Sequence, residues 1–132
     1  MLNKHQFYLD IAKTISQASY CKRLQVGALL VKDDNIISFG YNGTPKGFDN
    51  ECECDGRTKA EVLHAESNCI TKCALSTYSS RNSIMYTTHS PCVECAKLII
   101  QCEIKELYFS TEYRDNSGIK LLEKNNIYVK QI

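Results

Sequence analysis

The chain has 132 residues, of which 43% are hydrophobic and 23% charged, and its formal net charge is +1. This is an ordinary globular composition, and a chain of this length buries roughly two-thirds of its unfolded surface. The composition therefore excludes intrinsic disorder for most of the chain. No apolar run approaches the ~20 residues of a membrane-spanning helix, and a near-neutral charge argues against a nucleic-acid-binding surface, which would be basic. We therefore expect one domain over residues 1–132, with no membrane or nucleic-acid partner.

The cysteine content points to the cellular compartment and to metal binding. Eight cysteines is a high number for this length, and the opening residues MLNKHQFYLD lack the apolar segment of a signal peptide. We therefore expect a reducing, cytoplasmic environment, in which clustered Cys and His side chains are more often metal ligands than disulfide partners.

The first half of the chain predicts a helix, a hairpin and a long loop. Apolar side chains at helical spacing indicate an amphipathic helix over 3–18, with Phe7 and Ile11 on its buried stripe. Two apolar runs that flank a turn predict a β-hairpin over 26–41. Turn-forming residues then predict a long loop over 42–56, and loops of this length are often functional.

The second half alternates between helical and strand patterns. The expected helices cover 60–75, 92–102 and 116–125, and the expected strands cover 84–88, 107–111 and 127–131. Strands separated by helices form parallel, right-handed crossover units. Together with the hairpin, this predicts an α/β fold of three α/β/α layers. Its five-stranded mixed sheet would consist of an antiparallel hairpin followed by a parallel β-α-β-α-β unit.

Two short motifs, HAE at 64–66 and PCVEC at 91–95, have the residue types of a zinc site. Cys92 and Cys95 are three residues apart and so lie on one side of a helical turn. The positive end of that helix favours their thiolates. His64, Cys92 and Cys95 would give three protein ligands and leave the fourth position to water, which is the catalytic arrangement of zinc.

Glu66 follows the histidine ligand by two residues and can carry a proton from the activated water to a substrate nitrogen. The pattern H-x-E…P-C-x-x-C is the known signature of zinc nucleobase deaminases. The alternatives are a structural zinc knuckle, which needs a fourth protein ligand, and a redox CxxC pair, which does not need HAE. The other histidines, His5 and His89, are not expected to be ligands.

The chain resembles the deoxycytidylate (dCMP) deaminases of the cytidine deaminase superfamily, bacteriophage members in particular. The segments that carry the resemblance are QVGALLV, GYNGTPKGF, HAESN, SPCVECAKLII and IKELYFSTEY. The resemblance implies the cytidine-deaminase-like fold and zinc-dependent hydrolysis of dCMP to dUMP and ammonia, which supplies dUMP for thymidylate synthesis. It also implies a homohexamer, activation by dCTP, inhibition by dTTP and a cytoplasmic location, the host cytoplasm for a phage protein.

The resemblance also suggests which residues contact the substrate, in addition to His64 and Glu66. Tyr113 follows a parallel strand, at the edge of the sheet where such folds bind ligands; the alternative is packing on the last helix. Asn42 has an amide that could hold a sugar hydroxyl or a base edge, or it is a plain turn residue. Ser90 could offer its backbone carbonyl to the substrate amino group.

A second, structural zinc is a further expectation from the resemblance, which includes phage members with such a zinc. Cys21 and Cys52 match two of its ligands. The remaining ligands are open, with Cys54, Glu61 and Asp55 as candidates. The other three cysteines fall on predicted helices and are expected to be buried thiols: Cys69, Cys73 and Cys102.

The same loops could bind a regulatory triphosphate, with Mg²⁺ as its counterion. The candidate effector-binding residues are Lys22, Arg23, Asn42, Gly43 and Lys46. Glycines let the backbone approach the phosphates, and the cations would neutralise them. The alternative is that these cations are solvated surface residues. Two other functions stay open: an enzyme that acts on a base within a polynucleotide, and an inactive nucleotide sensor, which would be expected to lose Glu66.

Overall fold

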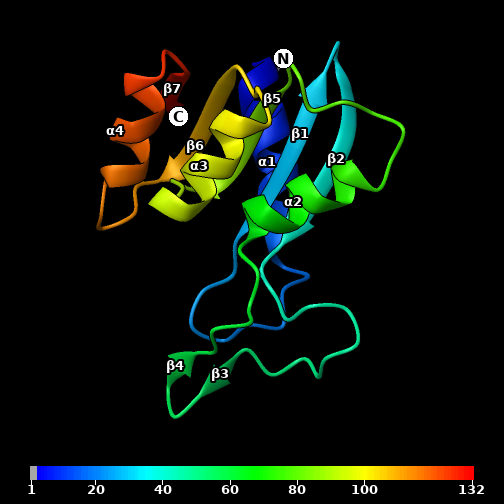
Figure 1. Ribbon diagram of the computed structural model, residues 1–132, viewed down its shortest axis with the longest axis vertical. Helices are drawn as coiled ribbons and strands as arrows, with labels where there is room; N and C mark the ends of the chain where they lie inside the picture. Colours follow the sequence, from blue (N-terminus) through cyan, green and yellow to red (C-terminus); the bar gives the residue numbers. More distant parts are fainter. Residues whose placement is uncertain (1–2) are drawn as a thin grey trace.

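The computed structural model describes residues 3–132 (Figure 1). The helices are α1 (Lys4–Ser16), α2 (Ala65–Ala74), α3 (Val93–Gln101) and α4 (Ser117–Lys124). The strands are β1 (Gly27–Lys32), β2 (Asn35–Tyr41), β3 (Glu53–Cys54), β4 (Arg57–Thr58), β5 (Ile84–His89), β6 (Glu106–Thr111) and β7 (Tyr128–Gln131). None of the helices in this range has the length and apolar character needed to cross a membrane.

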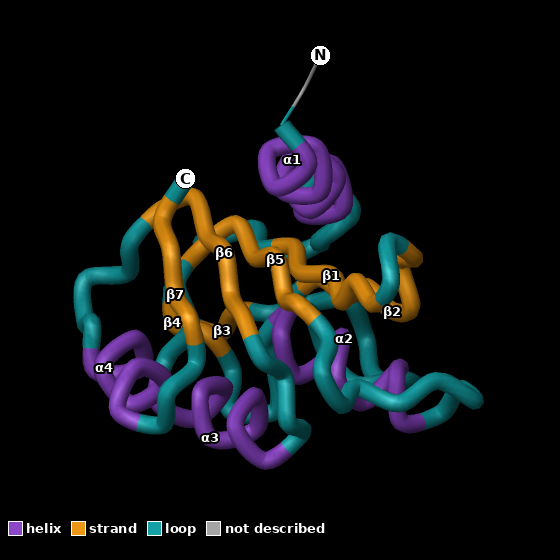
Figure 2. Tube along the Cα trace, turned by 90° about the horizontal axis from the view of Figure 1, so that it is seen from above, coloured by secondary structure: helices purple, strands orange, loops and turns teal. Residues whose placement is uncertain are grey.

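Five strands form one mixed sheet in the order β2-β1-β5-β6-β7. Strand β1 is antiparallel to both of its neighbours, whereas β5, β6 and β7 run parallel. Helix α1 covers one face of the sheet, and α2, α3 and α4 cover the other (Figure 2). The predicted three-layer fold, with a hairpin followed by a parallel β-α-β-α-β unit, is confirmed.

The core consists of one apolar cluster on each face of the sheet. The α1 face differs from the prediction, because Tyr8, Leu9 and Ala12 are its buried residues and Phe7 is 47% exposed. Helix α1 packs on β1 and β5, and residues 8, 9 and 12 share one apolar cluster with side chains of these strands. Ile11 lies at the margin of that contact and is only partly buried.

Helix α2 begins at Ala65, five residues later than predicted, because the preceding segment pairs with another part of the chain. The N–H of Gly43 donates to the carbonyl of Leu63 at 3.1 Å, and the N–H of Leu63 donates back at 2.8 Å. His64 therefore has extended backbone angles (φ −71°, ψ 156°) and is the N-cap of α2. The backbone pairing of Gly43 with Leu63 thus places His64 just before the first turn of α2 rather than within the helix.

Two loops project from the sheet at the carboxyl end of β5, next to each other (Figure 1). They are the 17–26 loop and the long loop, residues 42–64, which contains β3 and β4. The side chain of Asn42 joins them, because its Oδ1 accepts from the N–H of Val26 at 2.9 Å and its Nδ2 donates to the carbonyl of Leu24 at 2.8 Å. A disulfide between Cys21 and Cys52 joins them again.

Candidate active site

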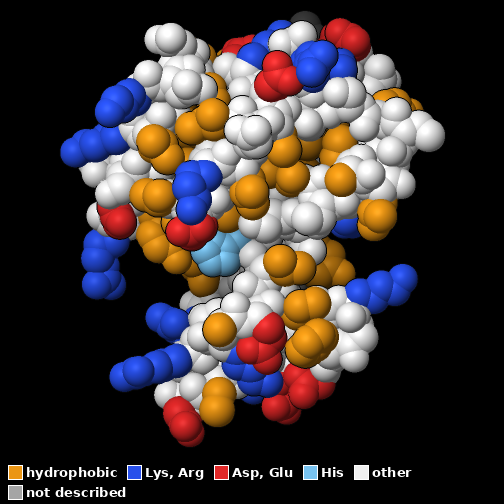
Figure 3. Space-filling model, in the orientation of Figure 1, with side chains coloured by type: hydrophobic (Ala, Val, Ile, Leu, Met, Phe, Trp, Pro, Cys, Tyr) orange, Lys and Arg blue, Asp and Glu red, His pale blue; other side chains and the backbone are white. Residues whose placement is uncertain are grey.

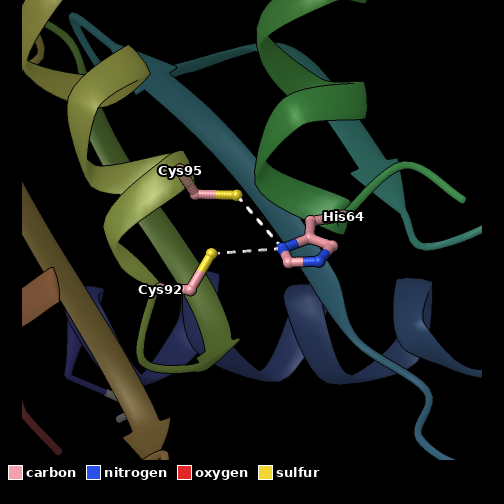
Figure 4. Close-up of side chains that lie close together, drawn as sticks. All are labelled: His64, Cys92 and Cys95. Atoms are coloured by element: carbon pink, nitrogen blue, oxygen red, sulfur yellow. Dashed lines mark hydrogen bonds between the residues drawn. The ribbon is translucent and has the colours of Figure 1, made fainter. Parts of the chain in front are cut away.

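His64, Cys92 and Cys95 come together at the N-termini of two helices (Figure 4). Nδ1 of His64 lies 3.4 Å from the Sγ atom of each cysteine. Cys92 is the N-cap of α3, and Cys95 lies in the first turn of that helix. The three-residue spacing thus places both sulfurs on one side of the turn, as predicted, and this side faces His64.

The three donor atoms fit a tetrahedral zinc ion. Zn–S bonds of about 2.3 Å and Zn–N bonds of about 2.0–2.1 Å place nitrogen and sulfur about 3.5 Å apart around such an ion. The observed separations of 3.4 Å agree. Hydrogen bonds with Cys95 and His64 lower the pKa of the Cys92 thiol to about 3, whereas the bond with Cys92 and burial raise the pKa of Cys95. Zinc bound by the two sulfurs would displace their protons.

Two neighbours support the cysteine ligands from outside the cluster. Ser67 Oγ lies 3.4 Å from Sγ of Cys95 and so can hydrogen-bond to that sulfur. Gly118, at the start of α4, packs against the Pro91–Cys92 turn, where an added Cβ would lie 2.1 Å from the carbonyl oxygen of Pro91. The backbone of α4 therefore lies in direct contact with the turn that carries Cys92.

Glu66 lies in the first turn of α2 and is only 4% exposed. Burial raises the pKa of its carboxyl group to about 7. A carboxyl group with a pKa in this range can both hold and release a proton at neutral pH. Since Glu66 and His64 line the same cavity, this carboxyl group lies beside the cluster of His64, Cys92 and Cys95.

The central cavity lies between the sheet body and the two loops. Its lining comprises Cys21, Arg23, Leu24, Val26, Asn42, Glu53, Thr58, Val62, His64, Ala65, Glu66, His89, Ser90, Cys92 and Tyr113. In the space-filling view the molecule narrows between body and loops, and a histidine is visible at this waist (Figure 3). The floor is buried, at Glu66 and Ser90, and the rim is exposed, at Arg23 and Thr58.

The three further candidates for substrate contact, Asn42, Ser90 and Tyr113, all line this cavity. Tyr113 is 44% exposed, and its backbone N–H donates to Oγ of Ser90 at 2.6 Å. The Ser90 hydroxyl thus holds the Tyr113 segment in place. The Asn42 amide holds the two loops together, as described above, and Nδ2 keeps one N–H free of its bond to Leu24. Their contacts with substrate stay predictions.

Sequence reasoning missed one cavity residue and assigned another to a different ligand. His89, set aside in the sequence, is half-buried in the lining, and its Nδ1 lies 2.9 Å from Oγ1 of Thr88. Burial lowers the pKa of the His89 ring. Its position at the end of β5, just before the Pro91–Cys92 turn, was the available signal. Arg23, expected at an effector site, lines the same cavity as Glu66.

The structure does not bring the expected second zinc set of Cys21, Cys52, Cys54 and Glu61 together. The sulfurs of Cys21 and Cys52 form a disulfide, so neither is a free thiolate. Cys54 lies at the tip of the β3–β4 hairpin and is exposed, as is Glu61. The acidic group beside the pair is instead Glu53. The disulfide also departs from the expectation of fully reduced cysteines.

The other cysteines follow the sequence prediction more closely. Cys69 and Cys73 are buried in α2, and Cys102, which follows α3, is half-buried. Burial raises the pKa of the Cys69 thiol to about 12, so that group stays protonated. These side chains therefore behave as small apolar residues of the core.

The residues expected to bind an effector lie in different parts of the structure. Gly43 lies in a hollow beside the central cavity, lined by Tyr20, Gly40, Tyr41, Gly43, Thr44, Asn50, Cys52, Asn68 and Lys72. Asn42 and Arg23 line the central cavity. The side chains of Lys22 and Lys46 are in the lining of neither. The residues grouped in the sequence thus do not form one site here.

Comparison with known proteins shows which family has this arrangement. Residues 2–111 match the family described as the cytidine and deoxycytidylate deaminase zinc-binding region. ComE operon protein 2 of Bacillus subtilis is 32% identical over 97% of this chain and 70% of its own length. The deoxycytidylate deaminase of Enterobacteria phage T4 is 33% identical over 82% of this chain and 78% of its own. A probable deoxycytidylate deaminase of Caenorhabditis elegans is 36% identical, and the chain spans 64% of its length.

A solved structure agrees with the whole chain. The crystal structure of dCMP deaminase from the cyanophage S-TIM5, in complex with dCMP and dUMP, is 40% identical and superposes with a TM-score of 0.96. The match covers 100% of both chains. The resemblance noted in the sequence is confirmed at this level. The chain is a deaminase and belongs to the cytidine and deoxycytidylate deaminase family.

Proposed function

We propose that the protein hydrolyses dCMP to dUMP and ammonia in a zinc-dependent reaction. The observation that carries the proposal is the grouping of His64, Cys92 and Cys95 beside the buried carboxyl of Glu66 in one cavity. The likeness to the cyanophage dCMP deaminase bound to dCMP and dUMP supports the choice of substrate.

The residues of the cavity have distinct parts in this reaction. His64, Cys92 and Cys95 would hold zinc, which would act as the Lewis acid that activates a water molecule. Glu66 accepts a proton from that water and delivers it to N3 of cytosine; it then accepts the second proton from the new hydroxyl group on C4 and delivers it to the departing amino group. A C4–O bond forms and the C4–N bond breaks, so that water and dCMP give dUMP and ammonia.

The remaining candidates bind and orient the nucleotide. The backbone carbonyl of Ser90, on the cavity floor, accepts a hydrogen bond from the 4-amino group. Asn42 and Tyr113 contact the sugar and the base from the loops above. Such contacts raise the rate because they hold the reacting carbon in the correct position before the chemical step.

The experiment is to measure ammonia release by zinc-loaded protein from dCMP, from deoxycytidine and from a cytosine-containing oligonucleotide. We expect turnover of dCMP well above that of the other two. Preference for the oligonucleotide would assign the protein to polynucleotide deamination, and absence of turnover on all three would indicate a nucleotide sensor. The presence of Glu66 in the cavity argues against a sensor.

We further propose that the product supplies thymidylate synthesis and that a homohexamer is regulated by triphosphates, with dCTP as activator and dTTP as inhibitor. The hollow beside Gly43 supports this part of the proposal, because it is distinct from the central cavity and has one cationic residue, Lys72, in its lining. An activator must bind the active arrangement better than the inactive one, and an inhibitor must do the reverse.

Regulation is tested by dCMP saturation curves alone, with dCTP–Mg²⁺ and with dTTP–Mg²⁺. We expect a sigmoidal curve that dCTP shifts to lower and dTTP to higher dCMP concentration, with changes of roughly 5–150-fold in affinity. Lys72→Ala should weaken both responses, whereas Lys46→Ala serves as control. Hyperbolic curves that ignore both triphosphates would remove the regulation and leave the deaminase proposal intact.

A further inference from the structure

We propose that the Cys21–Cys52 disulfide is a reversible redox link that holds the long loop over the central cavity, so that its reduction weakens substrate binding. This inference rests on the function proposed above. In the reducing environment expected from the sequence, protein disulfides are usually transient, catalytic or redox-sensing. The six other cysteines of the chain are free, so the cross-link is confined to this pair.

The disulfide lies in the wall between two hollows of the molecule. Cys21 lines the central cavity together with Glu66. Cys52 lines the hollow beside Gly43. Both cysteines are otherwise buried, with 4% and 1% of their surface exposed. A reductant therefore approaches the bond through one of the hollows, and a nucleotide in the central cavity covers the Cys21 side.

The long loop has little else to hold it in place. Among the described residues 3–132, none of its side chains belongs to either apolar core cluster. A backbone bridge closes the loop at its base. Further out, hydrogen bonds of Glu53 and Thr58 connect it to the 17–26 loop, and these bonds are exposed to solvent. The disulfide is thus the strong connection between the outer parts of the two loops.

The long loop supplies part of the cavity lining, so its order affects substrate binding. Glu53, Thr58 and Val62 are its contribution. When the link breaks, the outer part of the loop can open, as segments with few buried apolar contacts do. Substrate then binds only to the molecules in which the loop is closed, and the apparent affinity falls in proportion to their fraction.

The reaction of the link is a thiol–disulfide exchange. A dithiol reductant supplies two electrons and two protons, the S–S bond breaks to give two thiols, and the reductant becomes a disulfide. Thermodynamic linkage adds a second consequence. If the intact link raises the affinity for a nucleotide by some factor, the bound nucleotide favours the intact link by the same factor.

The first measurement compares the oxidised and the reduced wild type, both loaded with zinc, in dCMP kinetics. Intact mass after alkylation gives the fraction of intact link, and metal analysis shows that the catalytic cluster stays loaded. We expect a KM about 10-fold higher in the reduced form, as for a loop that is closed in about a tenth of the molecules, with little change in kcat.

Two variants connect this change to the link. Replacement of Cys21 and Cys52 together by serine should give the KM of the reduced form, with no response to dithiothreitol. Cys54→Ser is the matched control, because Cys54 is an exposed free thiol of the same loop. It should respond to dithiothreitol as the wild type does.

The second measurement is the redox equilibrium of the link in mixtures of oxidised and reduced dithiothreitol. Saturating dUMP should lower the midpoint potential by about 30 mV, which is a 10-fold factor for a two-electron couple. An equal KM in both redox forms, or a midpoint that dUMP does not move, would overturn the proposal. So would a second zinc ion that takes the place of the link on reduction. A wild type that deaminates dCMP in neither redox form would instead overturn the proposed function, and this proposal with it.

Discussion

Two cysteine clusters face the same cavity, and they differ in how the chain builds them. Cys92 and Cys95 are neighbours on one helical turn, and a histidine lies beside them. Cys21 and Cys52 are 31 residues apart on two loops, and a glutamate lies beside them. The first cluster keeps its thiols free for metal, and the second is a covalent link. Sequence spacing identifies the local cluster, whereas the fold alone decides the chemistry of the distant one.

The strongest test of this difference is the removal of one sulfur from the first cluster. Cys92→Ala should lose both zinc and activity, because two donors remain where zinc needs at least three from the protein. Cys102→Ala should keep both and lose only about 1 kcal/mol in free energy of unfolding. Metal content per chain, measured together with ammonia release, checks this. Comparable zinc loss in the two variants would show that the ligands are misassigned.

The acid beside the first cluster should act in catalysis and not in metal binding. Glu66→Ala should retain zinc and lower turnover of dCMP by about 10²–10⁴-fold, the usual scale of general acid–base catalysis. Glu94→Ala is the control, because Glu94 lies next to Cys95 but is exposed and pairs with Lys97. Zinc lost in parallel with activity in Glu66→Ala would contradict the assigned role.

The second cluster should contribute to stability rather than to chemistry. Replacing Cys21 and Cys52 together by serine should lower the free energy of unfolding by about 2–4 kcal/mol, because the unfolded chain loses a cross-link. Zinc should stay at one ion per chain. Denaturant unfolding with and without reductant, and intact mass after alkylation, measure the two effects. A second zinc ion bound by the reduced wild type would show that this cluster, too, is a metal site.

The smallest effect is expected from the hydroxyl beside Cys95. Ser67→Ala removes a hydrogen bond to the ligand sulfur and should change zinc affinity by up to about 10-fold, the lower end for such supporting contacts. Competition with a chelator measures the affinity directly. Thr71→Ala, four residues further along α2, is the control because its hydroxyl bonds only to helix carbonyls. The same shift in both variants would assign the effect to α2 as a whole.

The parts of the site that lie within a few residues were predictable from sequence. The HAE and PCVEC motifs each place their groups on a single helix start, and the parallel direction of β5, β6 and β7 followed from the alternation of helix and strand patterns. The start of α2 was not predictable, because the bridge between Gly43 and Leu63 forms only when the long loop folds back. The same holds for the Cys21–Cys52 bond and for Arg23 in the cavity, which depend on how two loops meet.

The close approach of Gly118 to the Pro91–Cys92 turn makes the C-terminal part of the chain a structural partner of the metal site. In a scan of all substitutions, we expect changes at Gly118 to abolish activity as changes at a zinc ligand do. Gly118 has no metal-binding side chain, but even a methyl group there would displace the turn that carries Cys92. Transplanting this chemistry into another scaffold would therefore require α4 in addition to the two helices that hold the ligands.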